Sequence, residues 1–315
     1  MGLIRRVHLR AHRSFAVHLR LAAAIIQRVI SRATSLPDPV QPSDWPWVEA
    51  GRIRHLQWSA YTLPMDDLPP SLVGLRVLHL SDTHIAETWM PAWDELHDRV
   101  QRDPPDVILM TGDFVDHIHD CRPALPLLRR FADGLRARLG VWGILGNHDG
   151  EMFRLRVGED FPVRLLHDQI VRLTDDNSDA AIEIVGVHGV SVRDPITPGL
   201  LDHLADKPPN TLRLVMAHFP SQVMTLATLK SDAIFAGHTH GGQVCLPGGH
   251  PIITHDPLPR RFARGAHRFD QTWLVVSRGL GFSGYAVRTF CPAEAIEVTL
   301  VSTASRQASS ESSNG

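Results

Sequence analysis

The sequence predicts an α/β fold whose strands pair mostly in parallel in the first half of the chain. Short apolar runs typical of buried strands recur along the chain, and amphipathic stretches with helical spacing lie between several of them. The 315 residues suffice for one large domain or two small ones, and no internal repeat is present. The composition, 43% hydrophobic and 21% charged, is that of a soluble globular protein.

The predicted elements follow one another in a regular order. The strands cover residues 76–80, 107–110, 141–145, 182–187, 212–217, 233–236, 272–276 and 295–300. Two helices are indicated by apolar side chains that share one face, namely Trp93, Leu96 and Val100 in the first and Leu125, Leu128 and Leu135 in the second. The strands alternate with these helices, which favours parallel pairing.

The two ends of the chain differ from this body. Residues 1–36 carry seven arginines and no acidic residue, and their apolar residues recur on one helical face, which predicts a basic amphipathic helix. Four prolines then indicate a stiff linker over residues 37–50. Residues 51–301 are predicted to form the folded domain. The serine-rich residues 302–315 are predicted to be a disordered tail.

The N-terminal pattern fits a helix lying in the plane of an anionic membrane surface. Its longest apolar run is far shorter than the roughly 20 residues that a bilayer span needs. Residues 1–36 have three alternative interpretations. They could pack on the domain or on a partner, serve as a targeting segment, or be disordered. We therefore expect a cytoplasmic protein peripheral to the inner membrane. Export is the alternative, because Arg5-Arg6 weakly resembles a twin-arginine signal.

The net charge bears on the possible binding partners, and the cysteines bear on the cellular compartment. The formal net charge is −2, and outside residues 1–36 no basic stripe interleaved with aromatic residues exists, so we expect no nucleic-acid partner. The three cysteines lie far apart without a C-x-x-C pair, which favours a reduced compartment and leaves a single disulfide open. The sequence does not indicate the oligomeric state.

Side chains that can bind metals follow five of the predicted strands. They are Asp82 and His84, then Asp113, then Asn147, His148 and Asp149, then His218, and finally His238 and His240. Since the carboxyl ends of strands in open α/β sheets form one crevice, we expect these side chains to converge. Carboxylate, imidazole and amide ligands without thiolate suit Mn²⁺, Fe²⁺/³⁺, Zn²⁺, Co²⁺ or Ni²⁺. Each motif alone is weak, but five in order form a strong joint signal.

This ordered set of motifs resembles the calcineurin-like metallophosphoesterase superfamily, over about residues 75–300. The motifs are Asp82-x-His84, Gly112-Asp113, Gly146-Asn147-His148-Asp149, His218 and Gly237-His238-Thr239-His240. The continuation Gly241-Gly242-Gln243, with Ser277-Arg278-Gly279 downstream, is similar to the bacterial branch of small membrane-associated phosphodiesterases that includes YaeI and YkuE. The resemblance implies a four-layer α-β-β-α sandwich of two mixed sheets.

The resemblance also implies roles for individual residues. One metal ion would be held by Asp82, His84, Asp113 and His240, and a second by Asp113, Asn147, His218 and His238. A metal-activated hydroxide would attack phosphorus. Asn147, His148 and Arg278 would contact the substrate phosphate, and His148 would protonate the leaving oxygen. Asp149 would either orient His148 or serve as a turn residue.

Substrate choice is expected to lie in the loops. Residues 244–267 carry three arginines and three histidines, which could bind an anionic substrate or lipid head groups, or could form a solvated surface loop. The resembling branch has relatives among UDP-diacylglucosamine pyrophosphatases. The leading prediction is a hydrolase of a phosphodiester or pyrophosphate bond in a lipid-linked substrate. The alternatives are a nuclease or cyclic-nucleotide phosphodiesterase, and a non-catalytic metal-binding scaffold.

Overall fold

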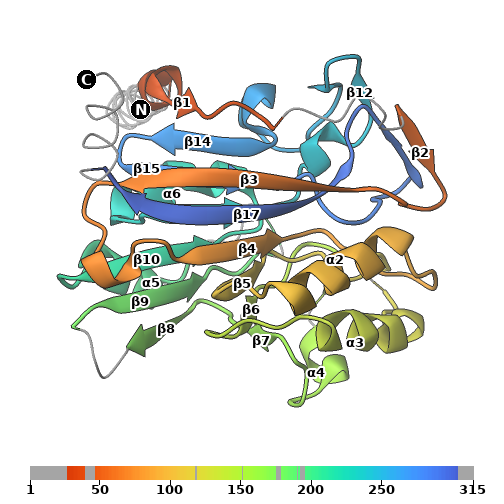
Figure 1. The fold of residues 1–315 in the computed structure, drawn as a ribbon, viewed down its shortest axis with the longest axis horizontal. Coiled ribbons are helices and arrows are strands. Elements are labelled where there is room, and N and C mark those ends of the chain that lie inside the picture. Colours follow the sequence, from red (N-terminus) through yellow and green to blue (C-terminus); the bar gives the residue numbers. More distant parts are fainter. Residues whose placement is uncertain are drawn as a thin grey trace, which may run out of the picture.

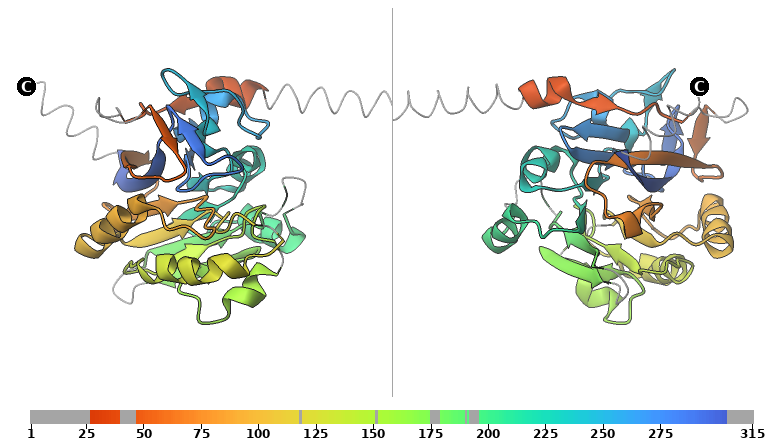
Figure 2. Two further views of the ribbon diagram at one scale, coloured as in Figure 1. Left: turned by 90° about the vertical axis from the view of Figure 1, so that its right-hand side faces the viewer. Right: turned by 60° about the vertical axis from the view of Figure 1, so that its left-hand side comes forward.

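Two β-sheets packed face to face, with helices on both outer faces, make up the body of the protein (Figure 1). The computed structural model describes residues 27–39, 47–117, 119–150, 152–174, 179–189, 191 and 196–303. In the views of Figure 2, α2 and α3, drawn orange to yellow-green, flank one side, and the teal helices α5 and α6 flank the other. This arrangement is the predicted four-layer sandwich.

The first sheet has six strands in the order β3-β17-β4-β5-β6-β7 and contains both parallel and antiparallel pairs. The β17–β4 pair is antiparallel, and the others are parallel. Its strands are β3 Leu56–Met65, β17 Ala293–Ser302, β4 Arg76–Leu80, β5 Val107–Met110, β6 Val141–Gly143 and β7 Arg164–Leu165.

The second sheet has seven strands in the order β1-β14-β15-β11-β10-β9-β8, with a parallel centre and antiparallel margins. Its strands are β1 Thr34–Ser35, β14 Gly265–Phe269, β15 Thr272–Val276, β11 Ala233–Ala236, β10 Thr211–Met216, β9 Ala181–Gly186 and β8 Gln169–Thr174. Two small two-stranded sheets complete the fold, from β12 Cys245–Leu246 with β13 His250–Pro251, and from β2 Val48–Ala50 with β16 Val287–Thr289.

Three buried apolar clusters fill the spaces between the four layers. The helices are α2 Pro91–Arg102, α3 Leu125–Asp133, α4 Phe153–Val157, α5 Pro198–Ala205 and α6 Val223–Leu226. The first cluster joins α2 and α3 to the six-stranded sheet, and the third joins α5 and α6 to the seven-stranded sheet. The second lies between the sheets. In β4, Leu78 faces the helices and Val77 faces the other sheet, as strand alternation requires.

The expected strands and the two expected helices are present, with small shifts at their ends. The strand expected at 141–145 ends at Gly143, because the chain turns there toward the predicted ligands. The prediction missed several strands, including β8 and β14; the longest of these is β3, whose buried Gln57 and Ser59 interrupt its apolar pattern. β3 is held by pairing with β17, more than two hundred residues later, where Leu56 lies opposite Ala293.

The predicted domain boundaries at residues 36, 50 and 301 stay predictions. Residues 27–32 of the expected N-terminal helix are helical, while residues 1–26 lie outside the described residues. Within the range predicted as a linker, residues 40–46 also lie outside them, and Val48–Ala50 form β2. Of the expected tail, residues 304–315 lie outside. Among the described residues, no helix is both long and apolar enough to cross a membrane.

Arg213 of the seven-stranded sheet binds backbone carbonyls at and near its outer helices, so its removal tests how much this buried network stabilises the fold. Its fully buried guanidinium pairs with Glu183 at 2.9 Å and donates to the carbonyls of Leu204, Asp206 and Leu229. Arg213→Ala leaves these buried acceptors without their donor, so we expect the free energy of unfolding to fall by about 3–5 kcal/mol. Urea unfolding followed by circular dichroism measures this loss.

Arg172→Ala is the matched control for this prediction. Arg172 pairs with the same Glu183 from the protein surface, where 41% of its side chain is exposed. Its removal should cost about 0–1 kcal/mol. Equal losses for the two variants would show that the buried network does not stabilise the sheet.

Candidate metal centre

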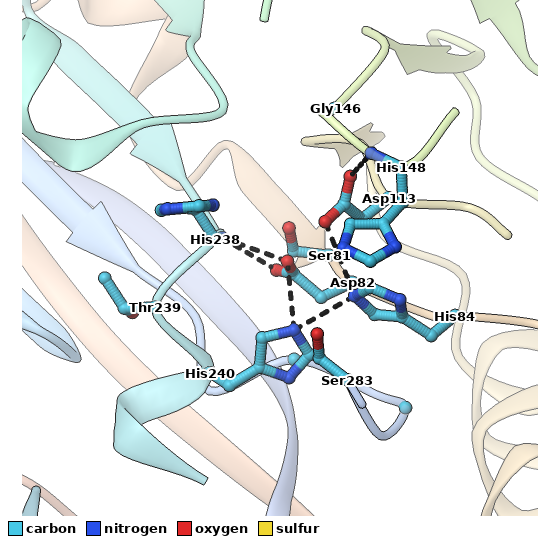
Figure 3. A network of polar contacts seen from close by, with 12 residues as sticks. Ser81, Asp82, His84, Asp113, Gly146, His148, His238, Thr239, His240 and Ser283 are labelled. Carbon is cyan, nitrogen blue, oxygen red and sulfur yellow. Dashed lines mark hydrogen bonds and ion pairs between the residues drawn. The ribbon is translucent and has the colours of Figure 1, made fainter. Parts of the chain in front are cut away.

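The carboxyl ends of β4, β5, β6, β10 and β11 meet at one place between the two sheets. The loops after β4 and β5 run side by side, because Asp82 N–H donates to the Gly112 carbonyl and His84 N–H donates to the Asp113 carbonyl. The contacts described below bring all eight predicted ligand and phosphate-contacting side chains after these strands together. Figure 3 shows several of them pointing toward one another.

One half of the centre is formed by Asp82, His84 and His240. His240 Nε2 lies 3.0 Å from His84 Nε2 and 3.4 Å from Asp82 Oδ1. His84 Nε2 also lies 3.4 Å from Asp113 Oδ2. Ligand atoms of Asp82, His84 and His240 are close enough to one another to hold a single metal ion.

The other half is formed around Asp113, Asn147, His218 and His238. Asn147 Oδ1 lies 3.0 Å from both His218 Nε2 and His238 Nδ1. Asp113 Oδ2 lies 3.5 Å from His218 Nε2, and Asp82, Asp113 and His218 form a second group that could hold a metal. Asp113 therefore faces both halves.

Backbone carbonyls hold the outer nitrogens of two imidazoles of the centre. His218 Nδ1 lies 2.7 Å from the Thr111 carbonyl, and His238 Nε2 lies 3.2 Å from the His255 carbonyl. A carbonyl only accepts, so each of these outer nitrogens carries a hydrogen and donates it. The inner nitrogens face the Asn147 oxygen and, in His218, the Asp113 carboxylate. Once deprotonated, each inner nitrogen can present its lone pair to a metal ion.

His84 follows the same pattern, with Asp116 as its outer partner. His84 Nδ1 lies 3.3 Å from Asp116 Oδ1, and Nε2 points inward. A carboxylate beside the outer nitrogen of an imidazole is typical of metal ligands. The residues present therefore fit divalent metals.

The pKa values of the centre reflect its crowded carboxylates. Burial opposes a charge on His84 and His218, but the nearby carboxylates outweigh it and raise the pKa of His84 to about 10 and that of His218 to about 9. Burial, with the charge on His218, lowers the pKa of His238 to about 4. The His218 charge holds the pKa of Asp113 well below its usual range, against the effect of burial. The site thus draws in positive charge.

Five of these residues adopt left-handed backbone conformations that side chains other than glycine rarely take. The φ angles are 51° at Asp82, 40° at His84, 52° at Asp113, 66° at His238 and 51° at His240. Each such residue costs about 1–3 kcal/mol and persists only where its surroundings enforce it. Here the carboxylates provide part of that enforcement. Asp82 Oδ1 accepts the backbone N–H of His238 at 3.0 Å, and Asp113 Oδ1 accepts that of His148 at 2.8 Å.

Asp149 forms hydrogen bonds with the backbone of the loops after β5 and β6, and not with the His148 imidazole. Its carboxylate accepts the backbone N–H groups of Gly146, Asp113 and Phe114 at 2.7–2.9 Å. The His148 Nδ1 lies instead 3.0 Å from the Asp116 carbonyl, which makes Nδ1 the donor and leaves Nε2 as the reactive nitrogen. Of the two roles expected for Asp149, the structure favours the turn residue.

Arg278, expected to bind substrate phosphate, lies instead in a buried ion pair. Its guanidinium contacts Glu294 and lies 3.3 Å from Asp38, and only 5% of the residue is exposed. We therefore correct that prediction, because the charge of Arg278 is already neutralised inside the domain.

Sequence reasoning missed two residues at the centre, Asp116 and Arg288. Asp116 contacts His84 and His148, and its signal was present as a second aspartate three residues after Asp113. Arg288 is buried, donates to the carbonyls of Arg278 and Gly281, and lies 3.3 Å from His240 Nδ1. No local pattern marked Arg288, because β16, in which it lies, places it beside His240, which is 48 residues away in the sequence.

A carboxylate–histidine centre at the strand ends of two packed mixed sheets defines the class of metal-dependent phosphoesterases. A family model described as calcineurin-like phosphoesterase matches residues 75–242. The chain belongs to the calcineurin-like phosphoesterase family. It is therefore a hydrolase of phosphoesters, and its family uses divalent metal ions.

Several bacterial proteins match most of the chain. It is 26% identical over 260 residues to YkuE of Bacillus subtilis, an uncharacterized metallophosphoesterase, covering 79% of this chain and 86% of YkuE. YkoQ of the same organism is 28% identical over 226 residues, with 70% and 81% covered. The UDP-2,3-diacylglucosamine pyrophosphatase LpxG of Chlamydia muridarum is 26% identical over 289 residues, with 71% and 82% covered.

Gly237 provides a test of the close packing behind the ligands. A Cβ at this position would lie 2.2 Å from Asp82 Oδ2 and 2.0 Å from Ser81 Oγ. Gly237→Ala must therefore displace the Asp82 carboxylate, and we expect metal affinity to fall by about 10–100-fold. Metal titration of the purified protein, with elemental analysis, measures the effect.

The control is Gly199→Ala, where an added Cβ meets nothing within 4 Å. This variant should bind metal like the parent. If Gly237→Ala also bound metal like the parent, Asp82 would not depend on the close approach of the β11 loop.

Proposed function

We propose that this centre holds two divalent metal ions and hydrolyses a phosphodiester or pyrophosphate bond in a lipid-linked substrate. The observation that carries the proposal is the position of Asp113, whose Oδ2 lies 3.4 Å from His84 and 3.5 Å from His218. One carboxylate between two sets of nitrogen ligands suits a bridging role. The first set would be Asp82, His84, Asp113 and His240, and the second Asp113, Asn147, His218 and His238.

The donor chemistry favours Mn²⁺, Fe²⁺/³⁺, Zn²⁺, Co²⁺ or Ni²⁺, because the site is rich in imidazole and contains no thiolate. When bound, such ions supply Lewis acidity that polarises the phosphoryl group and lowers the pKa of the attacking water.

His148 is the proposed general acid. The Asp116 carbonyl holds its Nδ1, and its backbone N–H donates to Asp113, so the imidazole is fixed beside the ligands. Its Nε2 is free to deliver a proton to the leaving oxygen. The ring lies 4.7 Å, between centroids, from that of His84.

Two observations support a lipid-linked substrate. The relative LpxG is a pyrophosphatase of an acylated nucleotide sugar, UDP-2,3-diacylglucosamine. The loop of residues 244–267 carries three arginines, and its His255 carbonyl contacts His238 directly. We accordingly propose a cytoplasmic enzyme that works at the surface of the inner membrane, with residues 1–36 contributing to membrane contact.

Catalysis can be tested with p-nitrophenyl phosphate and bis(p-nitrophenyl) phosphate in the presence of Mn²⁺, Zn²⁺, Ni²⁺ or Mg²⁺. We expect metal-dependent diester cleavage that a chelator abolishes. His148→Ala should retain bound metal and lower kcat by about 10²–10⁴-fold on a diester with an alkoxide leaving group, but far less on the p-nitrophenyl esters, because p-nitrophenolate leaves without a proton. Asp113→Asn should lose both activity and metal, because it weakens the shared ligand.

The surface histidine His203 provides the matched control, since His203→Ala removes an imidazole with 54% of its side chain exposed. This variant should keep full activity and metal content. A parent protein that binds no metal and cleaves no ester would contradict the proposed catalysis. Unchanged activity of His148→Ala on the diester with an alkoxide leaving group would reject the general-acid role alone.

The substrate class needs a separate test. UDP-2,3-diacylglucosamine in mixed micelles should be cleaved with a kcat/KM at least about tenfold above that of the same nucleotide sugar without acyl chains, since buried acyl chains contribute binding energy. Liquid chromatography of the nucleotide product measures both rates. Equal kcat/KM values for the two compounds would reject the lipid-linked substrate while leaving the phosphoesterase intact.

A further inference from the structure

One edge of the molecule exposes an unusual number of large apolar side chains. This apolar edge comprises Trp47, Val48, Leu246, Ile252, Ile253 and Tyr285. Their exposed fractions run from 42% at Ile252 to 85% at Tyr285. Single exposed apolar residues are ordinary, but a contiguous group of them on a soluble face marks an interaction surface.

Hydrogen bonds join the segments that carry these side chains. β2 pairs with β16, where Val48 lies opposite Thr289, and the Thr289 hydroxyl accepts the backbone N–H of Cys245 in β12 at 3.0 Å. β12 pairs with β13, which leads directly to Ile252 and Ile253. Gln243 Nε2 donates to the Tyr285 carbonyl at 2.9 Å. The side chains therefore project from one connected scaffold.

A basic cavity continues the apolar edge. This cavity, of about 550 Å³, is lined by His250, Arg260, Arg261, Arg264 and His267 among others, and its one acidic residue, Asp38, pairs with Arg264 at 2.8 Å. Arg260 and Arg261 are exposed on the short helical turn η6 Arg260–Phe262.

The helix of residues 27–32 adds further charge to this side of the molecule. Arg261 Nη2 donates to the Ile30 carbonyl, which ties the helix to η6, and the side chains of Arg28 and Arg32 are exposed. In Figures 1 and 2 this helix, in orange-red, and the hairpin that includes β12, in blue to cyan, both lie along the upper edge. The apolar and basic surfaces thus share one edge.

We propose that this edge docks on an anionic lipid bilayer, with Leu246, Ile252 and Ile253 entering the interface and the arginines of η6 binding lipid phosphates. Among the described residues, Arg260 and Arg261 pair with no acidic side chain. Exposed aliphatic and aromatic side chains beside such arginines match the two requirements of interfacial binding, apolar burial and attraction to anionic lipids. A folded protein partner would have to supply its own acidic groups to the same arginines, whereas an anionic bilayer presents phosphates everywhere.

Docking in this way would bring the metal centre to the lipid surface. Ile253 lies two residues before His255, whose carbonyl accepts from His238 at 3.2 Å. The same loop thus touches the bilayer and the ligand shell. This consequence rests on the proposed function, while docking itself does not require catalysis.

Binding to vesicles tests the proposal with the full chain. Vesicles of equal parts phosphatidylglycerol and phosphatidylcholine are sedimented with the parent and with Leu246→Ser/Ile252→Ser/Ile253→Ser. We expect at least about a tenfold lower partition coefficient for the triple variant, because three exposed aliphatic side chains no longer leave water. Arg260→Gln should lower partition by about fivefold on these vesicles and change nothing on pure phosphatidylcholine.

The matched controls lie on α4, away from this edge. Leu155→Ser and Arg154→Gln remove an even more exposed aliphatic residue and an exposed arginine, and both should bind vesicles like the parent. Hydrogen exchange provides a local readout: residues 244–256 should become protected when the parent binds vesicles. Unchanged hydrogen exchange in residues 244–256, together with full vesicle binding by the triple variant, would overturn the proposal. It would also be overturned if a protein partner protected these residues and vesicles did not.

Activity on bis(p-nitrophenyl) phosphate separates this proposal from the proposed function. The triple variant should retain the parental kcat/KM on this soluble diester, since none of its substituted residues lies among the metal ligands. Loss of vesicle binding with intact diester cleavage supports docking through the apolar edge. Vesicle binding that depends on this edge in a protein without diester cleavage would support docking and reject only the catalytic proposal.

Discussion

Asp113 connects the parts on which the centre depends. Its carboxylate faces His84 from one sheet and His218 from the other, while its backbone N–H is held by Asp149. It is almost completely buried, and so is Asp82. Two buried carboxylates need compensating positive charge, which the imidazoles of His84 and His218 or a bound metal ion can supply, since an unpaired charge in the interior is costly. The need for a cation is therefore built into the packing of the two sheets.

The packing of the rest of the fold offsets the free-energy cost of the strained metal centre. Five residues of the centre take left-handed backbone conformations, and the loops after β5 and β6 approach so closely that a Cβ on Gly112 would lie 2.4 Å from the Gly146 nitrogen. Such strain persists only on a rigid support. The three apolar clusters provide that support, because they bury both faces of each sheet and leave the strand ends little freedom.

The segment after β11 links the chemistry to the surface of the molecule. His238 and His240 lie at its start, His255 closes over His238, and the exposed Ile252 and Ile253 lie between. Cys245 and Cys291 pack as free thiols against the turn at Gly241 and Gly242. One continuous stretch of chain thus supplies metal ligands, an outer partner for an imidazole, and exposed side chains of the apolar edge.

The sequence by itself determined the α/β class, the main strands and the converging ligands. Strand periodicity is local, and each motif directly follows its strand, so that placing Asp82 or His238 at a strand end needed no knowledge of distant contacts. The long strand β3 escaped this reasoning because its pattern is stabilised by β17, far away in the sequence.

Only the tertiary structure decided which polar residues face the site. Arg278 and Arg288 both follow the β15 strand, yet Arg278 is neutralised by Glu294, whereas Arg288 lies beside His240. Asp149 sits next to His148 in the chain but binds backbone amides of another loop. The direction of a side chain depends on what packs around it, and those neighbours come from strands that the sequence separates by tens to hundreds of residues.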